Sequence, residues 1–199
     1  MLIEGTIITY NVVEGFLSVY AGIVAGSVVL VGFGLDSVIE VSAALVVLWH
    51  LSRSGDEVMP EWERRVATFV GITLLLVAVY VLGRAIYTLI TASEPEESYL
   101  GIGITAASVL VMPVVSRLQH QMAGRINSAA LKADSRETLV CTYLSVAALI
   151  GLGANALFGW WWADPVAALM LVFLIAREGR EIFTNKELIC VDDRPAAEL

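Results

Sequence analysis

Asp36 and Glu40 are two carboxylic acids inside a stretch of sequence that otherwise consists of membrane-like, uncharged residues. Residues 15–35 before them and 41–49 after them carry no charged side chain. Side chains four residues apart lie on one face of a helix. A carboxylate at the bilayer centre costs about 2.5–3.5 kcal/mol on insertion scales. Two such groups one turn apart repel each other unless a cation or a proton is present. The pair therefore predicts a cation site.

Glu137 and Cys141 repeat this four-residue spacing at the start of another long apolar run. A carboxylate and a thiolate are both metal ligands, so the two pairs together predict a cation pathway between two helices. Two other interpretations remain open for the second pair. Glu137 could be a solvated residue at a helix start, and Cys141 could be ordinary core packing.

Glu14 and Asn11 extend the polar positions to a third segment. Glu14 lies 12 residues before Gly26 and Asp36 lies 10 residues after it, so antiparallel helices joined at Gly26 place both acids at similar depth. Asn11 is three residues from Glu14 and shares its helix face. We expect these two side chains to support the metal ligands from behind or to carry protons. The alternative is a polar contact that only holds two membrane helices together.

The composition indicates a polytopic membrane protein. Of the 199 residues, 58% are hydrophobic and 16% are charged, and the mean hydropathy is +0.78. In such a chain the net charge of −8 does not indicate a nucleic-acid partner. The first residues lack the basic region of a cleavable signal peptide, so none is expected. With one cysteine in a predicted span and one in a predicted tail, no disulfide framework is expected.

The apolar runs predict an all-α membrane protein with six transmembrane helices, because one span needs about 20 residues. The first long run is more than twice that length and must turn back, most simply at Gly26. Asp164, at the start of the last span, is expected to be a helix cap. The expected domain is 1–183, followed by a short cytoplasmic tail at 184–199. The predicted spans are 5–25, 27–51, 66–92, 99–116, 128–157 and 164–182.

The distribution of basic residues predicts the orientation. On the six-span arrangement, eleven of the twelve Lys and Arg residues lie on one side, and the exception is Arg84. The loop at 93–98, on the other side, is acidic. The positive-inside rule then places both termini in the cytoplasm.

Four short segments carry a resemblance to a known family. They are Ser-Val-Val-Leu at 27–30, Gly-Leu-Asp-Ser-Val-Ile-Glu at 34–40, Ala-Leu-Lys-Ala-Asp at 130–134 and Trp-Ala-Asp-Pro-Val-Ala-Ala at 162–168. In order and spacing they resemble the cation diffusion facilitator (cation efflux) family of divalent-metal/proton antiporters. The resemblance implies metal ligands at Asp36 and Glu40 on the second helix and at Glu137 and Cys141 on the fifth.

The resemblance also implies a function. We expect a homodimeric, multi-pass protein of a bacterial inner membrane that exports a divalent cation in exchange for protons and is not an enzyme. Zn²⁺ is the expected substrate, with Mn²⁺, Fe²⁺, Co²⁺ and Cd²⁺ as alternatives, and no permanent cofactor is expected. The predicted ligand set contains no His, yet carboxylates and a thiolate remain compatible with zinc. The chain ends about 15 residues after the sixth span, so we expect a shortened branch without the family's C-terminal cytoplasmic domain.

Two other functions remain open at this stage. A proton-coupled exporter of organic cations would use Glu14 with aromatic residues around it, namely Tyr10, Phe16 and Tyr20, and would not need Cys141. A membrane scaffold or sensor would bind metal without moving it. Flux across a sealed membrane separates both from a metal transporter.

Overall fold

The computed structural model describes residues 2–52, 60–126 and 129–185. This part of the chain is helical, and no strand occurs within it. The helices are α1 (Leu2–Ala25), α2 (Val28–Ser52), α3 (Pro60–Thr91), α4 (Tyr99–Ile126), α5 (Ala129–Phe158) and α6 (Ala163–Asn185).

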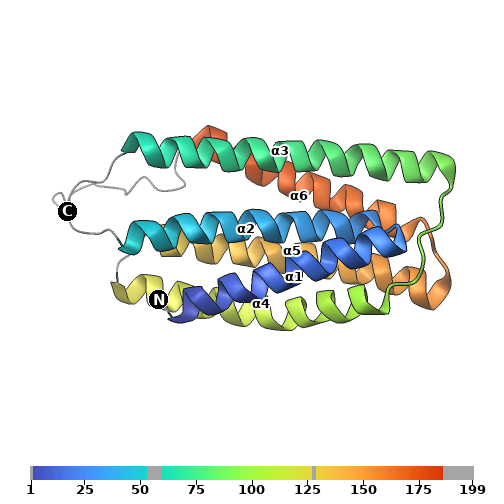
Figure 1. The fold of residues 1–199 in the computed structure, drawn as a ribbon, viewed down its shortest axis with the longest axis horizontal. Helices are drawn as coiled ribbons and strands as arrows, with labels where there is room; N and C mark the ends of the chain where they lie inside the picture. Colours follow the sequence, from blue (N-terminus) through green and yellow to red (C-terminus); the bar gives the residue numbers. More distant parts are fainter. Residues whose placement is uncertain (1, 53–59, 127–128, 186–199) are drawn as a thin grey trace, which may run out of the picture.

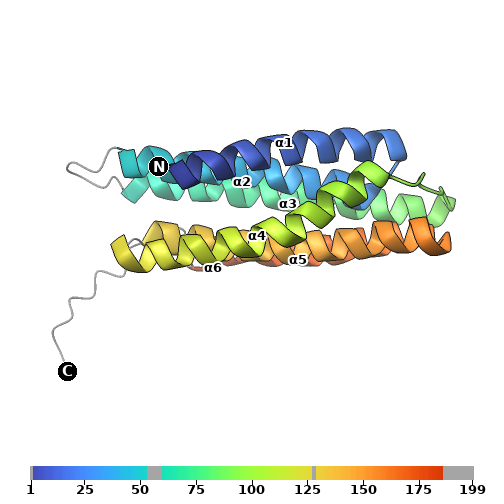
Figure 2. The same cartoon turned by 90° about the horizontal axis from the view of Figure 1, so that it is seen from below.

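The six helices lie side by side along the long axis of the molecule (Figure 1). α1 packs mainly on α2, α3 on α6 and α4 on α5. α2 occupies the middle of the bundle, since it contacts α1, α3, α5 and α6. α4 crosses the bundle obliquely, as the view from below shows (Figure 2). A side chain on the inner face of α2 can therefore meet groups from several helices.

The distribution of polarity is that of a membrane protein. Among the described residues, four helices contain segments long and apolar enough to span a bilayer: Gly5–Ala25, Gly71–Thr91, Tyr99–Met122 and Thr138–Phe158. Large apolar side chains such as Phe16, Ile90 and Leu157 are exposed on the outside. Polar side chains from α1, α2, α4 and α5 are buried inside. In lipid the apolar surface carries no penalty and polar groups must find partners inside the bundle.

The predicted turn at Gly26 is confirmed. Gly26 has φ +67°, and the Ser27 N–H donates to the Gly22 carbonyl at 2.9 Å, which is the Schellman arrangement that ends a helix. The two helices then run unusually close together. A Cβ added to Gly34 would lie 2.8 Å from the Val19 backbone N and 2.9 Å from the Gly15 carbonyl oxygen.

Two predicted boundaries differ from the structure. The fourth predicted span ends at residue 116, whereas α4 continues through the polar residues that follow to Ile126. Similarly, α3 begins at Pro60 rather than at residue 66. An apolar run marks the part of a helix that lies in lipid, while the helix itself continues as long as its residues favour helix. Proline is well suited to the first position of a helix.

Asp164 caps a helix other than its own. Its carboxylate accepts hydrogen bonds from the Ser27 hydroxyl, from the Val28 N–H at 2.9 Å and from the Val29 N–H at 3.4 Å. These groups form the beginning of α2, and the Ser27 hydroxyl oxygen in turn accepts from the Leu30 N–H at 3.2 Å. The start of α6 is thereby joined to the start of α2.

Candidate metal centre

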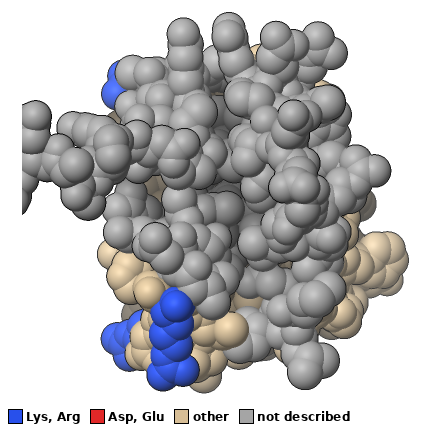
Figure 3. Space-filling model, turned by 90° about the vertical axis from the view of Figure 1, so that its left-hand side faces the viewer, with Lys and Arg blue, Asp and Glu red and all other residues tan. Residues whose placement is uncertain are grey.

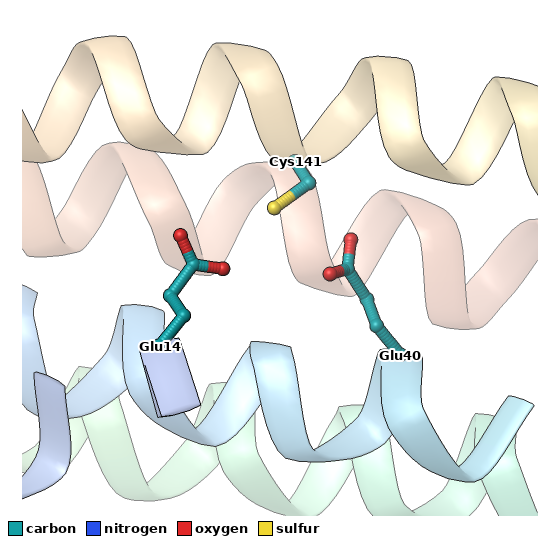
Figure 4. Close-up of side chains that lie close together, drawn as sticks. All are labelled: Glu14, Glu40 and Cys141. Atoms are coloured by element: carbon teal, nitrogen blue, oxygen red, sulfur yellow. The ribbon is translucent and has the colours of Figure 1, made fainter. Parts of the chain in front are cut away.

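Three side chains that can bind a metal ion meet in the interior of the bundle. Glu14 comes from α1, Glu40 from α2 and Cys141 from α5, and one ligand atom of each lies within 4.8 Å of the other two. All three are buried, with exposed fractions of 3%, 8% and 1% respectively. Figure 4 shows the two carboxylates and the thiol converging on one another.

The geometry suits one small cation. Zn²⁺ binds carboxylate oxygen at about 2.0–2.2 Å and thiolate sulfur at about 2.3 Å, so two ligands on opposite sides of one ion are at most about 4.5 Å apart. The observed limit of 4.8 Å is close to that span. Small side-chain adjustments would bring the three atoms onto one ion.

Two hydroxyl groups hold the Glu14 carboxylate. The Ser37 hydroxyl of α2 donates to its Oε2 at 3.2 Å, and the Ser108 hydroxyl of α4 donates to its Oε1. The Tyr10 hydroxyl in turn lies 3.1 Å from the Ser108 hydroxyl oxygen. These contacts fix Glu14 between three helices, so its position does not depend on α1 alone.

Asn11 contacts the second carboxylate. Its Nδ2 donates to Oε2 of Glu40 at 3.0 Å, in a contact that joins α1 to α2. The Asn11 side chain is buried, with 4% of its surface exposed. Its other polar atom, Oδ1, has no hydrogen-bond partner.

The predicted site residues fall into three groups in the structure. Glu40 and Cys141, predicted as ligands on two helices, lie together in the cluster. Asp36 is buried one turn before Glu40, within electrostatic reach of Cys141, but is not a member of the group. Glu137 lies in α5, and its side chain is outside the described residues. A metal-binding role for these residues remains a prediction.

Glu14 is one of the three members of the cluster, whereas the sequence predicted a supporting role for it. Glu14 lies at the depth expected from its distance to Gly26, since the hydroxyl of Ser37, the residue after Asp36, donates to the Glu14 carboxylate. The sequence could not show that the Glu14 side chain also reaches α5. That proximity depends on how α1 and α5 are rotated about their axes.

The aromatic residues around Glu14 do not form the cavity that an organic-cation exporter would need. Phe16 is 72% exposed and Tyr20 is 59% exposed, so both face the outside of the bundle. Tyr10 is partly buried and contacts Ser108. The arrangement favours a site lined by carboxylates and a thiol.

Comparison with known proteins shows the family of the chain. The chain matches the cation efflux transmembrane domain over residues 6–186. It belongs to the cation efflux family. The family match, the long apolar helices and the lipid-like exterior together define a multi-pass integral membrane protein.

Several curated relatives are similar at low identity. An uncharacterised transporter of Synechocystis sp. is 27% identical over 173 residues, which are 83% of this chain and 55% of the relative. The manganese efflux system protein MneS of Bacillus subtilis is 25% identical over 157 residues, 75% of this chain and 54% of the relative. The cation-efflux pump FieF of Shewanella oneidensis is 26% identical over 94 residues, 47% of this chain and 31% of the relative. The matched region thus spans about half or less of each relative's length.

Proposed function

We propose that this protein exports a divalent transition-metal cation, in the first place Zn²⁺, from the cytoplasm in exchange for protons. The observation that carries the proposal is the convergence of Glu14, Glu40 and Cys141 from three helices inside a cation efflux domain. Asp36 would add negative charge beside the ion, and Glu137 is the further candidate ligand on α5.

The chemistry of the donor atoms favours zinc over manganese. A thiolate prefers Zn²⁺ and other soft ions, whereas Mn²⁺ prefers oxygen ligands. Two carboxylates with one thiolate therefore form a mixed site that suits Zn²⁺ best. Manganese is the second candidate, because one relative is named as a manganese efflux protein.

Proton exchange follows from the requirement that ligands be deprotonated. A carboxylic acid or a thiol must lose its proton before it binds a metal, so metal binding releases protons from the site. If the site opens alternately to the two sides of the membrane, protons entering from outside would displace the metal there. Metal and protons would then move in opposite directions.

The charged residues support an orientation with both termini in the cytoplasm. Figure 3 views the end of the bundle at which α1 begins; described Lys or Arg residues are visible there and described Asp or Glu residues are not. The acidic residues Glu94, Glu96 and Glu97 lie in the α3–α4 connection at the other end (Figure 1). The positive-inside rule would place the basic end in the cytoplasm of a bacterial cell. We also propose six membrane spans and, by family resemblance, a homodimer.

Flux into sealed vesicles tests the function. The purified full chain, reconstituted with a Zn²⁺-sensitive dye inside, should take up Zn²⁺ when the vesicle interior is more acidic than the outside. A protonophore should abolish the part of the Zn²⁺ uptake that the pH gradient drives. Glu40→Gln should abolish the uptake altogether. Zn²⁺ binding without uptake by the wild type would instead indicate a scaffold or sensor. Uptake that ignores pH on both sides would indicate a passive facilitator.

A further inference from the structure

The side chain of Asn11 has a buried oxygen atom, Oδ1, that accepts no hydrogen bond. Within the described residues, two buried side-chain polar atoms lack a hydrogen-bond partner, Asn11 Oδ1 and Ser18 Oγ. Leaving a buried acceptor unpaired costs about 1–3 kcal/mol, and such a group calls for a specific reason. Of these two atoms, Oδ1 belongs to a side chain that touches the candidate metal centre.

The contact with Glu40 identifies which end of the Asn11 amide is free. Asn11 Nδ2 donates to Glu40 Oε2 at 3.0 Å, so the amide NH₂ faces that carboxylate. Oδ1 shares the amide carbon with that nitrogen and therefore lies within one amide width of the contact. The last torsion of an Asn side chain is broad. A modest rotation can thus bring Oδ1 toward an ion held by Glu14, Glu40 and Cys141.

A neutral oxygen is the donor that this site needs. Zn²⁺ in proteins is usually four-coordinate, and the cluster supplies three ligands that become anionic when they bind. Together they carry a charge of −3 against the +2 of the ion. A third carboxylate as the fourth ligand would increase the excess negative charge in a membrane interior, where uncompensated charge is costly. An amide oxygen, in place of the Glu137 carboxylate predicted from the sequence, completes the coordination without adding charge.

We propose that Asn11 Oδ1 is a metal ligand, so that α1 supplies two ligands, Asn11 and Glu14, to a four-ligand site with Glu40 and Cys141. This inference rests on the proposed function and extends it. It makes α1 part of the coordination sphere, in addition to the paired positions predicted on the second and fifth helices. Asn11 and Glu14 lie three residues apart on one face, as two ligands from a single helix require.

Co²⁺ binding to the purified full chain tests this proposal, because the visible spectrum of Co²⁺ reports ligand number and thiolate ligation separately. Asn11→Leu removes the amide at similar size. Loss of a residue that only supports a metal ligand typically lowers metal affinity about 10–100-fold. Loss of a ligand should lower the Co²⁺ affinity by at least that much. It should also change the d–d bands while the thiolate-to-cobalt band remains. Ser18→Ala, at the other unpartnered atom of α1, is the matched control and should change neither.

Asn11→Asp separates coordination from support, because it keeps an oxygen at this position and loses the NH₂ that holds Glu40. Coordination by oxygen predicts that Asn11→Asp retains the wild-type d–d spectrum and binds far more tightly than Asn11→Leu. Equal loss of affinity in both variants, or an unchanged spectrum in Asn11→Leu, would overturn the proposal and make Asn11 a contact between helices only. Failure of the wild type to bind Co²⁺, or no effect of Glu40→Gln on binding, would contradict the proposed function itself.

Discussion

Asp164 and the Glu14–Glu40–Cys141 cluster are two places where acidic groups are buried, and they differ in what surrounds them. The Asp164 carboxylate is met by donors, namely one hydroxyl and two backbone N–H groups at the start of α2. In the cluster, acidic groups from three helices approach one another to within 4.8 Å. Both places bury their acidic groups, so burial alone does not distinguish them, whereas the partners of each group do.

The Asp164 carboxylate and the acidic groups of the cluster differ in whether they need a cation or a proton to be stable in the interior. The N-terminus of a helix carries partial positive charge and unpaired N–H groups, so the Asp164 carboxylate is stabilised as it stands. At an effective dielectric constant of about 20, two unit charges 4.8 Å apart repel by about 3 kcal/mol. Ionised together, the three groups of the cluster would need a cation, and without one they would need protons. Asp164 needs neither.

The largest expected effect comes from removing an acid of the cluster. Glu40→Gln keeps the side-chain length and an oxygen that can accept from Asn11, but it removes the charge. Zn²⁺ affinity, measured by calorimetric titration, should fall by more than 100-fold, beyond the range seen for loss of a supporting contact. The metal-free variant should be as stable as the wild type or more so, because one repulsive charge is gone. Retained affinity would exclude Glu40 as a ligand.

The next largest effect should come from separating α1 from α2. In Gly34→Ala the new methyl group would lie 2.8 Å from the Val19 backbone N, and overpacking of this kind costs about 1–3 kcal/mol. The thermal unfolding midpoint in detergent should fall, and Zn²⁺ affinity should fall with it because Glu14 moves away from Glu40. Gly103→Ala in α4, where an added Cβ meets nothing within 4 Å, should change neither quantity. Equal behaviour of the two variants would contradict the packing argument.

Asp164→Asn should lower the stability of the fold and leave Zn²⁺ affinity unchanged, which is the opposite of what Glu40→Gln should do. Loss of a charged acceptor at the start of α2 should destabilise the fold by about 1–3 kcal/mol. It should leave Zn²⁺ affinity unchanged, since no acid of the cluster is altered. Thermal unfolding and calorimetric titration of the same sample measure both quantities. A large loss of metal affinity at unchanged stability would remove the distinction between the two places.

A smaller effect is expected from the type of sulfur ligand. Cys141→Ser replaces a soft donor with a hard one of similar size, so affinity for Zn²⁺ and Cd²⁺ should fall more than affinity for Mn²⁺. Competition titrations with the three metals measure the ratio. Equal losses for all three metals would indicate that Cys141 only packs against its neighbours.

Several residues of the candidate site could be predicted from the sequence, because charged residues are rare within segments that span a bilayer. The cost of a carboxylate in hydrocarbon marks Asp36 and Glu40 as candidate site residues, and counting from Gly26 places Glu14 at a depth similar to that of Asp36. Depth and helix face follow from a period of 3.6 residues. Which helices face each other follows from packing between segments far apart in the chain. The sequence therefore predicted neither the partner of Asp164 nor the proximity of Glu14 to Cys141.

The end of α4 illustrates a second limit. The sequence placed the end of the fourth span at residue 116, where the apolar run stops, but the helix continues to Ile126. Hydropathy reports the solvent around a helix, whereas the hydrogen bonds of the backbone continue into polar residues. The part of α4 beyond residue 116 carries Gln119, whose Oε1 accepts a hydrogen bond from the Thr138 hydroxyl of α5 at 2.9 Å.

X-ray absorption at the zinc edge of the Zn²⁺-loaded protein tests the central claim most directly. A site built from Cys141 and carboxylates predicts one sulfur at about 2.3 Å and the remaining ligands as oxygen at about 2.0–2.2 Å. Cys141→Ser should remove the sulfur contribution, while Cys190→Ser, outside the described residues, should leave it intact. A zinc environment without sulfur in the wild type, or one that loses sulfur only in Cys190→Ser, would contradict the assignment of this cluster as the metal site.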